Sequence, residues 1–465
     1  MRLELNGTNV ISESERHGKP SSLFWPWCGA NVSLLAMSYG AYVLTFGVTL
    51  RGALAAAVIG TILSFLLVGL SSIAGKKTNA PTMVVSRAAF GVKGNIVPGF
   101  LSYLIFVGWE TVLVSLATLA TGTVFARLGG ISDNSAMILG FVIALLLTAL
   151  GGVVGFHLIM KIQRWLTLGT IALSLIYVAL TFGKIEWDLN GGTAHGNSTS
   201  FIGATIFCIT GIGLGWVNSG SDYSRYLPRS TSSRSVVGWT VFGASIVPIL
   251  MVIYGAALSA SDFRLAENIA TDPIGALTTV LPTWFLIPFA FVAITGLVGG
   301  AILDLYSSGL TLITIGVPVK RHIAAVFDAA IMVIGTIYIV WIADDFFFPF
   351  QGFLITLGVP IAAWSAIFVV DVLKRKSYSE ADFYDANGLY GSWNINALFW
   401  MVLGTFVGWG FVTNTFAQWL AWQGYFLHLI GGVEGNWAFT NVGVIFALVL
   451  SGGGYALTWN SFARR

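Results

Sequence analysis

Charged residues are scarce in this sequence. Asp, Glu, Lys and Arg make up only 9% of its 465 residues, whereas 56% are hydrophobic. A soluble globular protein carries about 25% charged residues, so a surface that faces water over the whole chain is excluded. Apolar runs near the roughly 20 residues that a helix needs to cross a bilayer recur along nearly the whole sequence. The main solvent of this protein is therefore lipid.

Cysteine and histidine are also rare. Cys28 and Cys208 both lie in apolar runs, so we interpret them as packing residues rather than as a disulfide. An enzyme needs a convergent nucleophile, base or metal set, and a channel lines its pore with repeated polar rings. The sequence shows neither pattern, so we expect no cofactor and no certain metal site, and a membrane enzyme and a channel stay as rival interpretations. The histidines, which lack metal-like spacing, are His17, His157, His195, His322 and His428.

Twelve apolar runs are long enough to span a membrane. None has the alternating pattern of a barrel strand, so we expect helices throughout. The predicted spans cover residues 24–49, 54–74, 97–124, 135–157, 165–183, 200–220, 237–259, 282–314, 323–343, 350–372, 395–420 and 437–459.

Lysine and arginine fall mostly on one side of these spans. If the N-terminus is cytoplasmic, all but four of the 23 Lys and Arg residues lie on the cytoplasmic side. This bias predicts a multi-pass protein of the cell inner (plasma) membrane with both termini in the cytoplasm. The net charge of +3 reflects topology and needs no nucleic-acid partner. The exceptions are Arg51, Arg127, Lys184 and Arg264.

Two spans carry helix-breaking residues at matching positions. Gly29 and Asn31 interrupt the first span, and alternating glycines from Gly211 to Gly215 precede Trp216 in the sixth. Glycine is a poor helix former, so both places are candidate unwound points. The two spans are equivalent if the chain holds two inverted five-helix repeats, and broken helices in inverted halves point to a transporter site at the midplane. Glycines that only permit close helix packing are the alternative.

The third and eighth spans each hold one carboxylate near the middle. Glu110 follows Trp109 directly, and Asp304 lies on a helical stripe of small and polar residues. A charge at this depth costs about 2.5–3.5 kcal/mol on insertion scales and is a functional hypothesis by default. Because no Lys or Arg lies inside a predicted span, a proton, a metal cation or a ligand must neutralise both. A protonated carboxyl bonded to a backbone carbonyl is the structural alternative.

Three loop motifs connect the spans in a specific order. They are "NAPTMVVSRAAFGVKGN" at residues 79–95, "GWVNSGSDYSRYLP" at 215–228 and "DVLKRKSYSEADFYDANGLYG" at 371–391. They resemble, in this order, the signature loop after helix two, the segment after helix six and the loop after helix ten of the nucleobase–cation symporter family. Members of that family carry purines, cytosine, allantoin and hydantoins. With the spans, the resemblance covers essentially the whole chain.

The resemblance implies an all-α integral membrane protein of the leucine-transporter type. Its twelve transmembrane helices would form a five-plus-five inverted repeat plus two extra helices, and it would work by alternating access. The predicted divisions are a cytoplasmic tail at 1–23, a first repeat at 24–184, a second, inverted repeat at 200–372 and helices eleven and twelve at 395–460.

The resemblance also implies site residues. In family members a heterocyclic ring stacks on a tryptophan of helix three, which corresponds to Trp109, and a polar residue of helix eight, which corresponds to Asp304, bonds the ring. We take Trp216 as the aromatic residue of helix six. The predicted substrate-binding residues are Trp109, Trp216, Asp304, Gly215 and Asn31. The predicted coupling-ion residues are Glu110, Asp304, Ala30, Ser33 and Thr295.

Two features depart from the family pattern. Leu113 stands where many members have Asn or Gln, one turn after the helix-three tryptophan. Thr295 is present in helix eight, but Val298 and Gly299 stand where some members carry a hydroxyl pair that binds sodium. The second departure favours a proton over sodium as the coupling cation.

These observations predict a secondary active transporter and not an enzyme. We expect it to import a nucleobase or related heterocycle, a purine or cytosine, by symport with a cation. An allantoin or hydantoin permease of the same family is the alternative. The expected partners are a small heterocyclic substrate and the lipid bilayer, and the sequence sets no oligomeric state.

Overall fold

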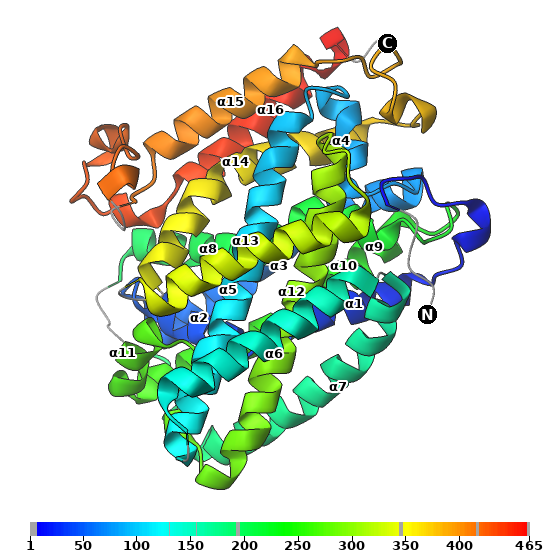
Figure 1. The fold of residues 1–465 in the computed structure, drawn as a ribbon. Helices are drawn as coiled ribbons and strands as arrows, with labels where there is room; N and C mark the ends of the chain where they lie inside the picture. Colours follow the sequence, from blue (N-terminus) through cyan, green and yellow to red (C-terminus); the bar gives the residue numbers. More distant parts are fainter. Residues whose placement is uncertain are drawn as a thin grey trace.

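The computed structural model is built from helices (Figure 1). It describes residues 7–129, 131–154, 156–191, 196–343, 347–414 and 418–462, and no strand occurs among these residues. Nine stretches of the described chain are long and apolar enough to cross a membrane, and the other predicted spans contain shorter apolar helices. The eleventh span, predicted to run to residue 420, ends as a helix at Gly410, and its residues 415–417 lie outside the described residues. Residues 1–6 of the predicted tail, residue 155 of the fourth predicted span and His195 lie outside the described residues.

The two halves of the chain repeat one order of elements. Each half has an interrupted span, a long helix, a short helix and then three long helices. The helices of the first half are α1 (Phe24–Asn31), α2 (Leu35–Leu44), α3 (Leu50–Thr78), α4 (Thr82–Phe90), α5 (Ile96–Leu128), α6 (Asp133–Val154) and α7 (Phe156–Thr181). Those of the second half are α8 (Ser198–Cys208), α9 (Gly220–Ser224), α10 (Ser233–Ser261), α11 (Phe263–Thr271), α12 (Leu286–Thr314), α13 (Arg321–Trp341) and α14 (Phe347–Lys374).

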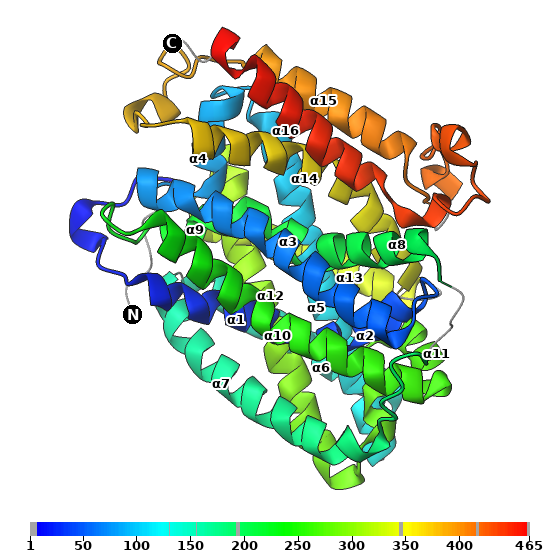
Figure 2. The same ribbon diagram turned by 180° about the vertical axis from the view of Figure 1, so that it is seen from behind.

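Two further helices, α15 (Ile395–Gly410) and α16 (Gly443–Phe462), follow the second half. They lie side by side and pack on α14 along one edge of the molecule, whereas α6 and α7 pack on α12 at the opposite edge (Figures 1 and 2). Between these edges α5 and α12 pack along each other over most of their length. The helices that carry Trp109 and Asp304 therefore lie at the centre of the bundle.

The first span is interrupted where the sequence predicts it. The α-helix ends at Asn31 and resumes at Leu35, and Val32 between them has a ψ of 81°, outside the helical range. The Asn31 side-chain Nδ2 donates to Trp27 O at 2.9 Å, which satisfies one carbonyl of the last turn of α1.

The sixth span changes its helical type and does not become extended. After α8, a π-helix covers Ile209–Gly213 and a 3₁₀-helix covers Leu214–Ser219, before α9 begins. Both forms are typical of functional or strained positions inside a helix. The alternating glycines thus mark a local rewinding of the backbone at the level where the first span is interrupted.

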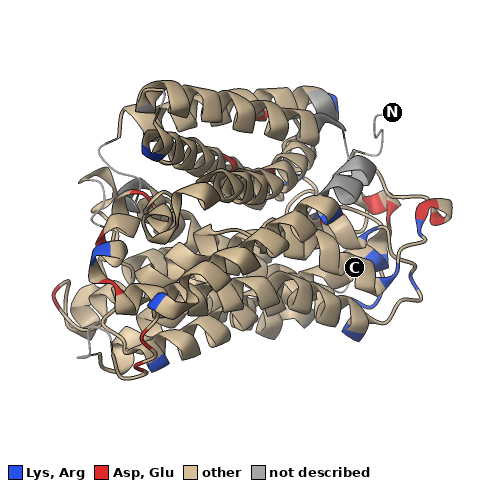
Figure 3. Ribbon diagram, turned by 90° about the horizontal axis from the view of Figure 1, so that it is seen from below, with Lys and Arg blue, Asp and Glu red and all other residues tan. Residues whose placement is uncertain are grey.

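Both chain termini lie at one end of the bundle, and most Lys and Arg segments gather there (Figure 3). We call this the basic end. Helix α5 begins there, just after the loop that carries Lys93, and α13 begins there after Lys320. This clustering agrees with the sequence, in which Lys and Arg are concentrated in every second loop between the predicted spans.

The crossing of α2 and α10 depends on two glycines. A Cβ atom on Gly40 would collide with the backbone of Ala256, and one on Gly255 would collide with Met37 O. We expect Gly255→Ala to destabilise the protein by about 1–3 kcal/mol, as overpacking of a core does, and to lower the midpoint of thermal unfolding in detergent. Gly238→Ala, on the same helix with open space around the new atom, is the control and should be neutral or stabilising. Equal midpoints for the two variants would contradict the close crossing.

Candidate functional site

A small cavity lies where the interrupted spans meet α5 and α12. Its volume is about 60 Å³, room for roughly two water molecules. Residues from the first span, the sixth span, α5, α10 and α12 surround it, so both halves of the chain contribute. The lining residues are Ala30, Asn31, Ser33, Leu35, Ala36, Tyr39, Trp109, Leu113, Gly211, Ile212, Trp216, Pro248 and Asp304.

Trp109 forms one wall of this cavity. Its half-buried indole meets the rings of Phe350 and Phe353 of α14 edge-on, with centroids 5.5 and 6.3 Å away and interplanar angles of 76° and 79°. A Cβ atom on Gly215 would stand 2.9 Å from Trp109 Nε1. The missing side chain at Gly215 therefore lets the rewound sixth span approach the indole closely.

Trp216 also lines the cavity, from the sixth span. Its ring packs edge-on against Trp27 of α1, with centroids 6.0 Å apart and an interplanar angle of 89°. Tyr39 of α2 adds a third aromatic wall and is nearly parallel to Phe350, with centroids 6.3 Å apart. Aromatic side chains thus reach the cavity from the first, third and sixth spans.

Asp304 supplies the only carboxyl among the lining residues. Its side chain is 2% exposed, and Oδ2 has no hydrogen-bond partner among the described residues. A buried polar atom without a partner is costly, so a ligand N–H that reached Oδ2 would relieve a cost already present in the protein.

Glu110 lies behind the cavity and does not line it. Its side chain is 0% exposed, and neither carboxyl oxygen has a hydrogen-bond partner among the described residues. Its neighbours are Ser308 and two acidic residues, Asp304 and Asp328. Asp328 was not among the predicted site residues. The sequence does mark Asp328, because it is the only carboxylate within the apolar predicted span 323–343.

Thr295 lies apart from the cavity. Its hydroxyl donates to Phe291 O at 2.7 Å and lies 3.3 Å from the hydroxyl of Thr170 on α7. Two glycines of α12 lie close to the interruption in the first span. A Cβ atom on Gly296 would stand 2.8 Å from Val32 O, and one on Gly300 would stand 3.4 Å from Ala30 O. Among the described residues, no group of three His, Cys, Asp or Glu side chains could hold a metal ion.

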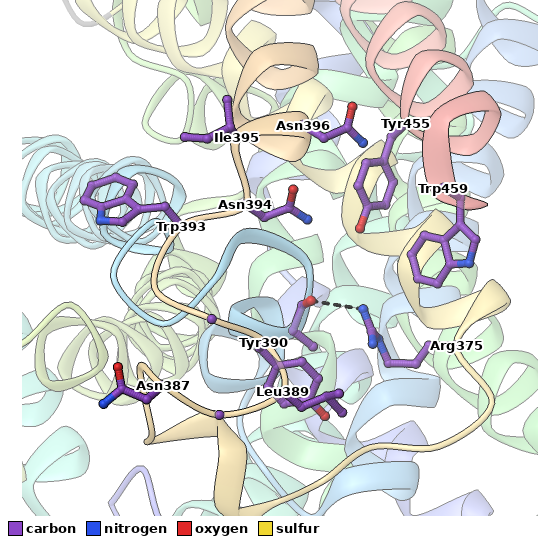
Figure 4. Close-up of a pocket in the computed structure, with 13 residues that line it drawn as sticks. Arg375, Asn387, Leu389, Tyr390, Trp393, Asn394, Ile395, Asn396, Tyr455 and Trp459 are labelled. Atoms are coloured by element: carbon purple, nitrogen blue, oxygen red, sulfur yellow. Dashed lines mark hydrogen bonds between the residues drawn. The ribbon is translucent and has the colours of Figure 1, made fainter. Parts of the chain in front are cut away.

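A larger cavity of about 450 Å³ lies elsewhere, between the loop after α14 and helices α15 and α16 (Figure 4). Arg375 points into it and donates two hydrogen bonds to the Asp371 carboxylate, from Nη2 at 2.7 Å and from Nε at 2.9 Å. The rings of Tyr390 and Trp459 lie against the guanidinium. Burial alone would lower the pKa of Arg375, but the hydrogen bonds and charge of Asp371 raise it above its ordinary value. Because Asp371 already neutralises the cation, we interpret this cluster as the anchor of the 371–391 motif.

The structure brings six predicted site residues to one cavity and leaves three outside its lining. Ala30, Asn31, Ser33, Trp109, Trp216 and Asp304 line the cavity, and Gly215 touches Trp109 from its edge. Glu110 lies one layer behind, and Thr295 lies apart. Sequence reasoning did not predict Tyr39, Phe350 and Phe353. An aromatic residue in an apolar span can face the site, the lipid or the core, and the sequence alone does not distinguish these three positions.

Two interrupted spans that enclose a small cavity between inverted halves define a secondary transporter of the leucine-transporter fold. The sequence profile of the permeases for cytosine/purines, uracil, thiamine and allantoin matches residues 10–432. The chain belongs to this family. The predicted family, the helical inverted-repeat fold and the assignment as a transporter and not an enzyme are thereby confirmed.

Individual relatives agree with this family. A putative purine-cytosine permease of Bacillus subtilis, YxlA, is 26% identical over 411 residues, which cover 85% of each chain. The purine-cytosine permease FCY2 of Saccharomyces cerevisiae is 25% identical over 267 residues, or 55% of this chain and 48% of that one.

Solved structures show the same fold. Mhp1, a nucleobase-cation-symport-1 family transporter, in a closed conformation with bromovinylhydantoin bound, superposes with a TM-score of 0.72 at 17% identity, covering 99% of this chain and 96% of that chain. Its inward-facing conformation gives a TM-score of 0.69 at 18% identity, covering 99% and 95%. At this level of identity the likeness concerns the fold alone.

The contact between Gly215 and Trp109 can be tested directly. We expect Gly215→Ala to push the indole out of its place and to weaken the apparent affinity for whichever labelled compound the wild type takes up, among cytosine, adenine, uracil and allantoin, by roughly fivefold or more, equivalent to about 1 kcal/mol of overpacking. Gly238→Ala on α10, which has open space around its new Cβ and lies outside the cavity lining, is the control and should keep wild-type affinity. Wild-type affinity in Gly215→Ala would show that Gly215 has no role in the cavity.

Proposed function

We propose that the protein imports a nucleobase or related heterocycle, a purine or cytosine, by symport with a proton. The observation that carries this proposal is the cavity between the interrupted spans, where two indole rings and one buried, unpartnered carboxyl oxygen converge. An allantoin or hydantoin permease of the same family is the second candidate. It is favoured by the hydantoin compound named in the Mhp1 structure.

The lining suits a flat ring that carries N–H groups. Trp109 and Trp216 would offer stacking surfaces, and Asp304 would accept a hydrogen bond from a ring N–H. Asn31 uses its Nδ2 on Trp27 O, so its carbonyl oxygen is the group left for a ligand. Ligand pockets usually hold about 300–1,000 Å³, so the cavity of about 60 Å³ must widen to admit substrate. Such widening is what alternating access requires.

The contacts of α12 support a proton as the coupling cation. Sodium prefers a cage of oxygen ligands, as other hard cations do. Ala30 and Ser33 could supply backbone oxygens, but the facing residues Gly296 and Gly300 carry no side-chain oxygen, and the Thr295 hydroxyl is bonded elsewhere. Glu110 has the properties of a proton carrier, since it is fully buried, unpartnered and one layer from the cavity.

The placement in the membrane forms part of this proposal. We place the basic end of the bundle in the cytoplasm and the protein in the inner (plasma) membrane, following the positive-inside bias. Residues 24–184 and 200–372 would be the two inverted repeats. Residues 395–460 would lie outside the moving core, and residues 1–23 would be a cytoplasmic tail.

Counterflow in proteoliposomes tests the proposed function. Liposomes are loaded with unlabelled cytosine, adenine, uracil or allantoin and diluted into the same labelled compound. Transient accumulation of label is expected for at least one compound, because only a carrier exchanges substrate without net flux. Label that enters monotonically would indicate a channel, and no entry of any compound would contradict the proposal.

Trp109 is expected to stack on the substrate. Base–aromatic stacking is worth about 1–3 kcal/mol by alanine substitution, so Trp109→Ala should weaken binding by about 5- to 150-fold. The apparent affinity from competition uptake measures this change. Trp239→Ala, which removes an exposed indole from α10, controls for a general effect of losing tryptophan. Unchanged affinity in Trp109→Ala would assign the indole to packing against α14.

Glu110 is expected to carry the coupling proton. Glu110→Gln mimics the protonated acid, so the variant should still exchange labelled substrate in counterflow but should fail to concentrate it under an imposed proton gradient. The same proteoliposomes serve for both measurements, which separates coupling from folding. Accumulation equal to that of the wild type would show that Glu110 is a structural residue.

A further inference from the structure

A second buried carboxyl, Asp328 of α13, continues from Glu110 toward the basic end. Its side chain is 0% exposed. The Tyr103 hydroxyl of α5 donates to Asp328 Oδ1 at 2.6 Å, and the Ser308 hydroxyl of α12 donates to Asp328 Oδ2 at 2.9 Å. Helix α5, which is distant in sequence, thus meets the consecutive helices α12 and α13 at one carboxyl. We call this set of residues the acidic path: Glu110, Ser308, Asp328 and Tyr103.

Ser308 connects the two carboxyls. It lies beside Glu110 but makes no hydrogen bond to it, because its hydroxyl points to Asp328 Oδ2 or, at 3.1 Å, to Leu305 O. Its oxygen can therefore accept a hydrogen bond from a protonated Glu110 while its own O–H donates to Asp328. A serine in this position can pass a proton between two acids.

No basic side chain accompanies these acids. Among the described residues, the charged groups that act on Glu110 are Asp328 of α13 and Asp304 of α12, and the groups that bond Asp328 are the Tyr103 and Ser308 hydroxyls. On the cavity side, Tyr223 of α9 is the titratable neighbour of Asp304. A structural ion pair is therefore excluded for the acidic path. Its members can be neutral only by holding protons.

The acidic path is ordered by depth. Tyr103 and Glu110 are seven residues apart on α5, which places them on nearly the same face, about 10 Å apart along the axis. Tyr103 lies seven residues from the start of α5 at Ile96, and Asp328 lies seven from the start of α13 at Arg321. Along their own helices, each therefore lies about 10 Å from the helix start at the basic end, and Glu110 lies about 21 Å from the start of α5.

An apolar cluster closes the path at its shallow end. The Tyr103 ring packs with Val107, Leu312 and Ala324, all of them buried. Of these, Leu312 and Ala324 lie between the path and the basic end along their helices, whereas Val107 lies on the Glu110 side of Tyr103. Passage of a proton beyond Tyr103 therefore requires the cluster to open, which would tie proton release to the conformation of α5, α12 and α13.

We propose that the acidic path carries the coupling proton between the substrate cavity and the basic end of the bundle. In the transfer step, the Glu110 O–H proton moves to Ser308 Oγ as the Ser308 proton moves to Asp328 Oδ2. Glu110 is left as a carboxylate and Asp328 as a neutral acid, so charge and protons balance and no other reactant is needed. This proposal rests on the proposed function as a proton symporter, and it adds Asp328, Ser308 and Tyr103 to the machinery.

Transport by Asp328→Asn provides the first test. The amide keeps the size and the hydrogen-bonding capacity of the acid, and residue 328 does not touch the cavity. The probe is whichever of cytosine, adenine, uracil or allantoin exchanges in the wild type. We expect exchange to persist, while accumulation under an inside-alkaline gradient and substrate-driven proton uptake into the liposomes are both lost. Tyr103→Phe should retain exchange and slow accumulation.

The matched control is Tyr177→Phe. Tyr177 is equally buried, and its hydroxyl donates to Leu277 O at 3.2 Å, away from the acidic path. It should transport and accumulate like the wild type. Accumulation and proton uptake at wild-type levels in Asp328→Asn would overturn the path. If Asp328→Asn loses its fold, judged by thermal unfolding, Tyr103→Phe decides the question, and accumulation at the wild-type rate in that variant would overturn the path.

Infrared difference spectroscopy needs no substrate, so it separates failure of the path from failure of the proposed function. In purified wild-type protein, changing the pH should alter carboxylic C=O bands that Glu110→Gln and Asp328→Asn each partly remove. Coupled acids shift each other's titration, so Asp328→Asn should also shift the midpoint of the band that Glu110→Gln removes, whereas Tyr177→Phe should not. Independent midpoints, or bands that do not respond to pH, would overturn the path.

Discussion

An interrupted helix inside a bilayer must hide its free backbone groups within the protein, and this requirement organises the centre of the molecule. The first span opens between Asn31 and Leu35, and the glycine face of α12 covers it, with Gly296 and Gly300 close to the carbonyls of the break. No side chain intervenes there, so α12 approaches the first span closely and brings Asp304 to the cavity. The close approach that hides the backbone also leaves little room for side-chain ligands of a metal cation.

The second constraint is the lack of basic neighbours, among the described residues, for Glu110, Asp304 and Asp328. An unpaired carboxylate at membrane depth is costly and is retained where it serves function. Asp304 faces the cavity, whereas Glu110 and Asp328 lie behind it. The acids thus fall into two groups, one that lines the cavity and one that does not. A single conformational change that moves α12 would affect both groups at once, since Asp304 and Ser308 are one turn apart on that helix.

The sequence predicts the membrane fold well, because hydrophobic length and charge bias depend only on composition along the chain. It also places the first interruption, since Gly29 and Asn31 are poor helix formers in an apolar run. The helical type of the sixth span was harder to predict from the sequence. Alternating glycines indicate where an α-helix weakens, but they do not indicate whether the backbone becomes extended or rewinds into π and 3₁₀ turns, as it does here. The aromatic wall from α14 could not be predicted, because Phe350 and Phe353 look like any other apolar residues of a span.

Asp328 shows that comparing equivalent spans of the two repeats identifies only some of the buried acids. Glu110 and Asp304 stand out because the third and eighth spans correspond in the two halves, but α13 belongs to the ninth span, whose counterpart α6 has no carboxyl in its interior. An inverted repeat therefore explains the scaffold, and asymmetry between the halves explains the chemistry placed on it. The acidic path uses α5 from one half and α12 and α13 from the other. The Tyr103–Asp328 hydrogen bond joins the two halves directly, so a conformational change that separated α5 from α13 would break it, and with it the continuity of the proposed path.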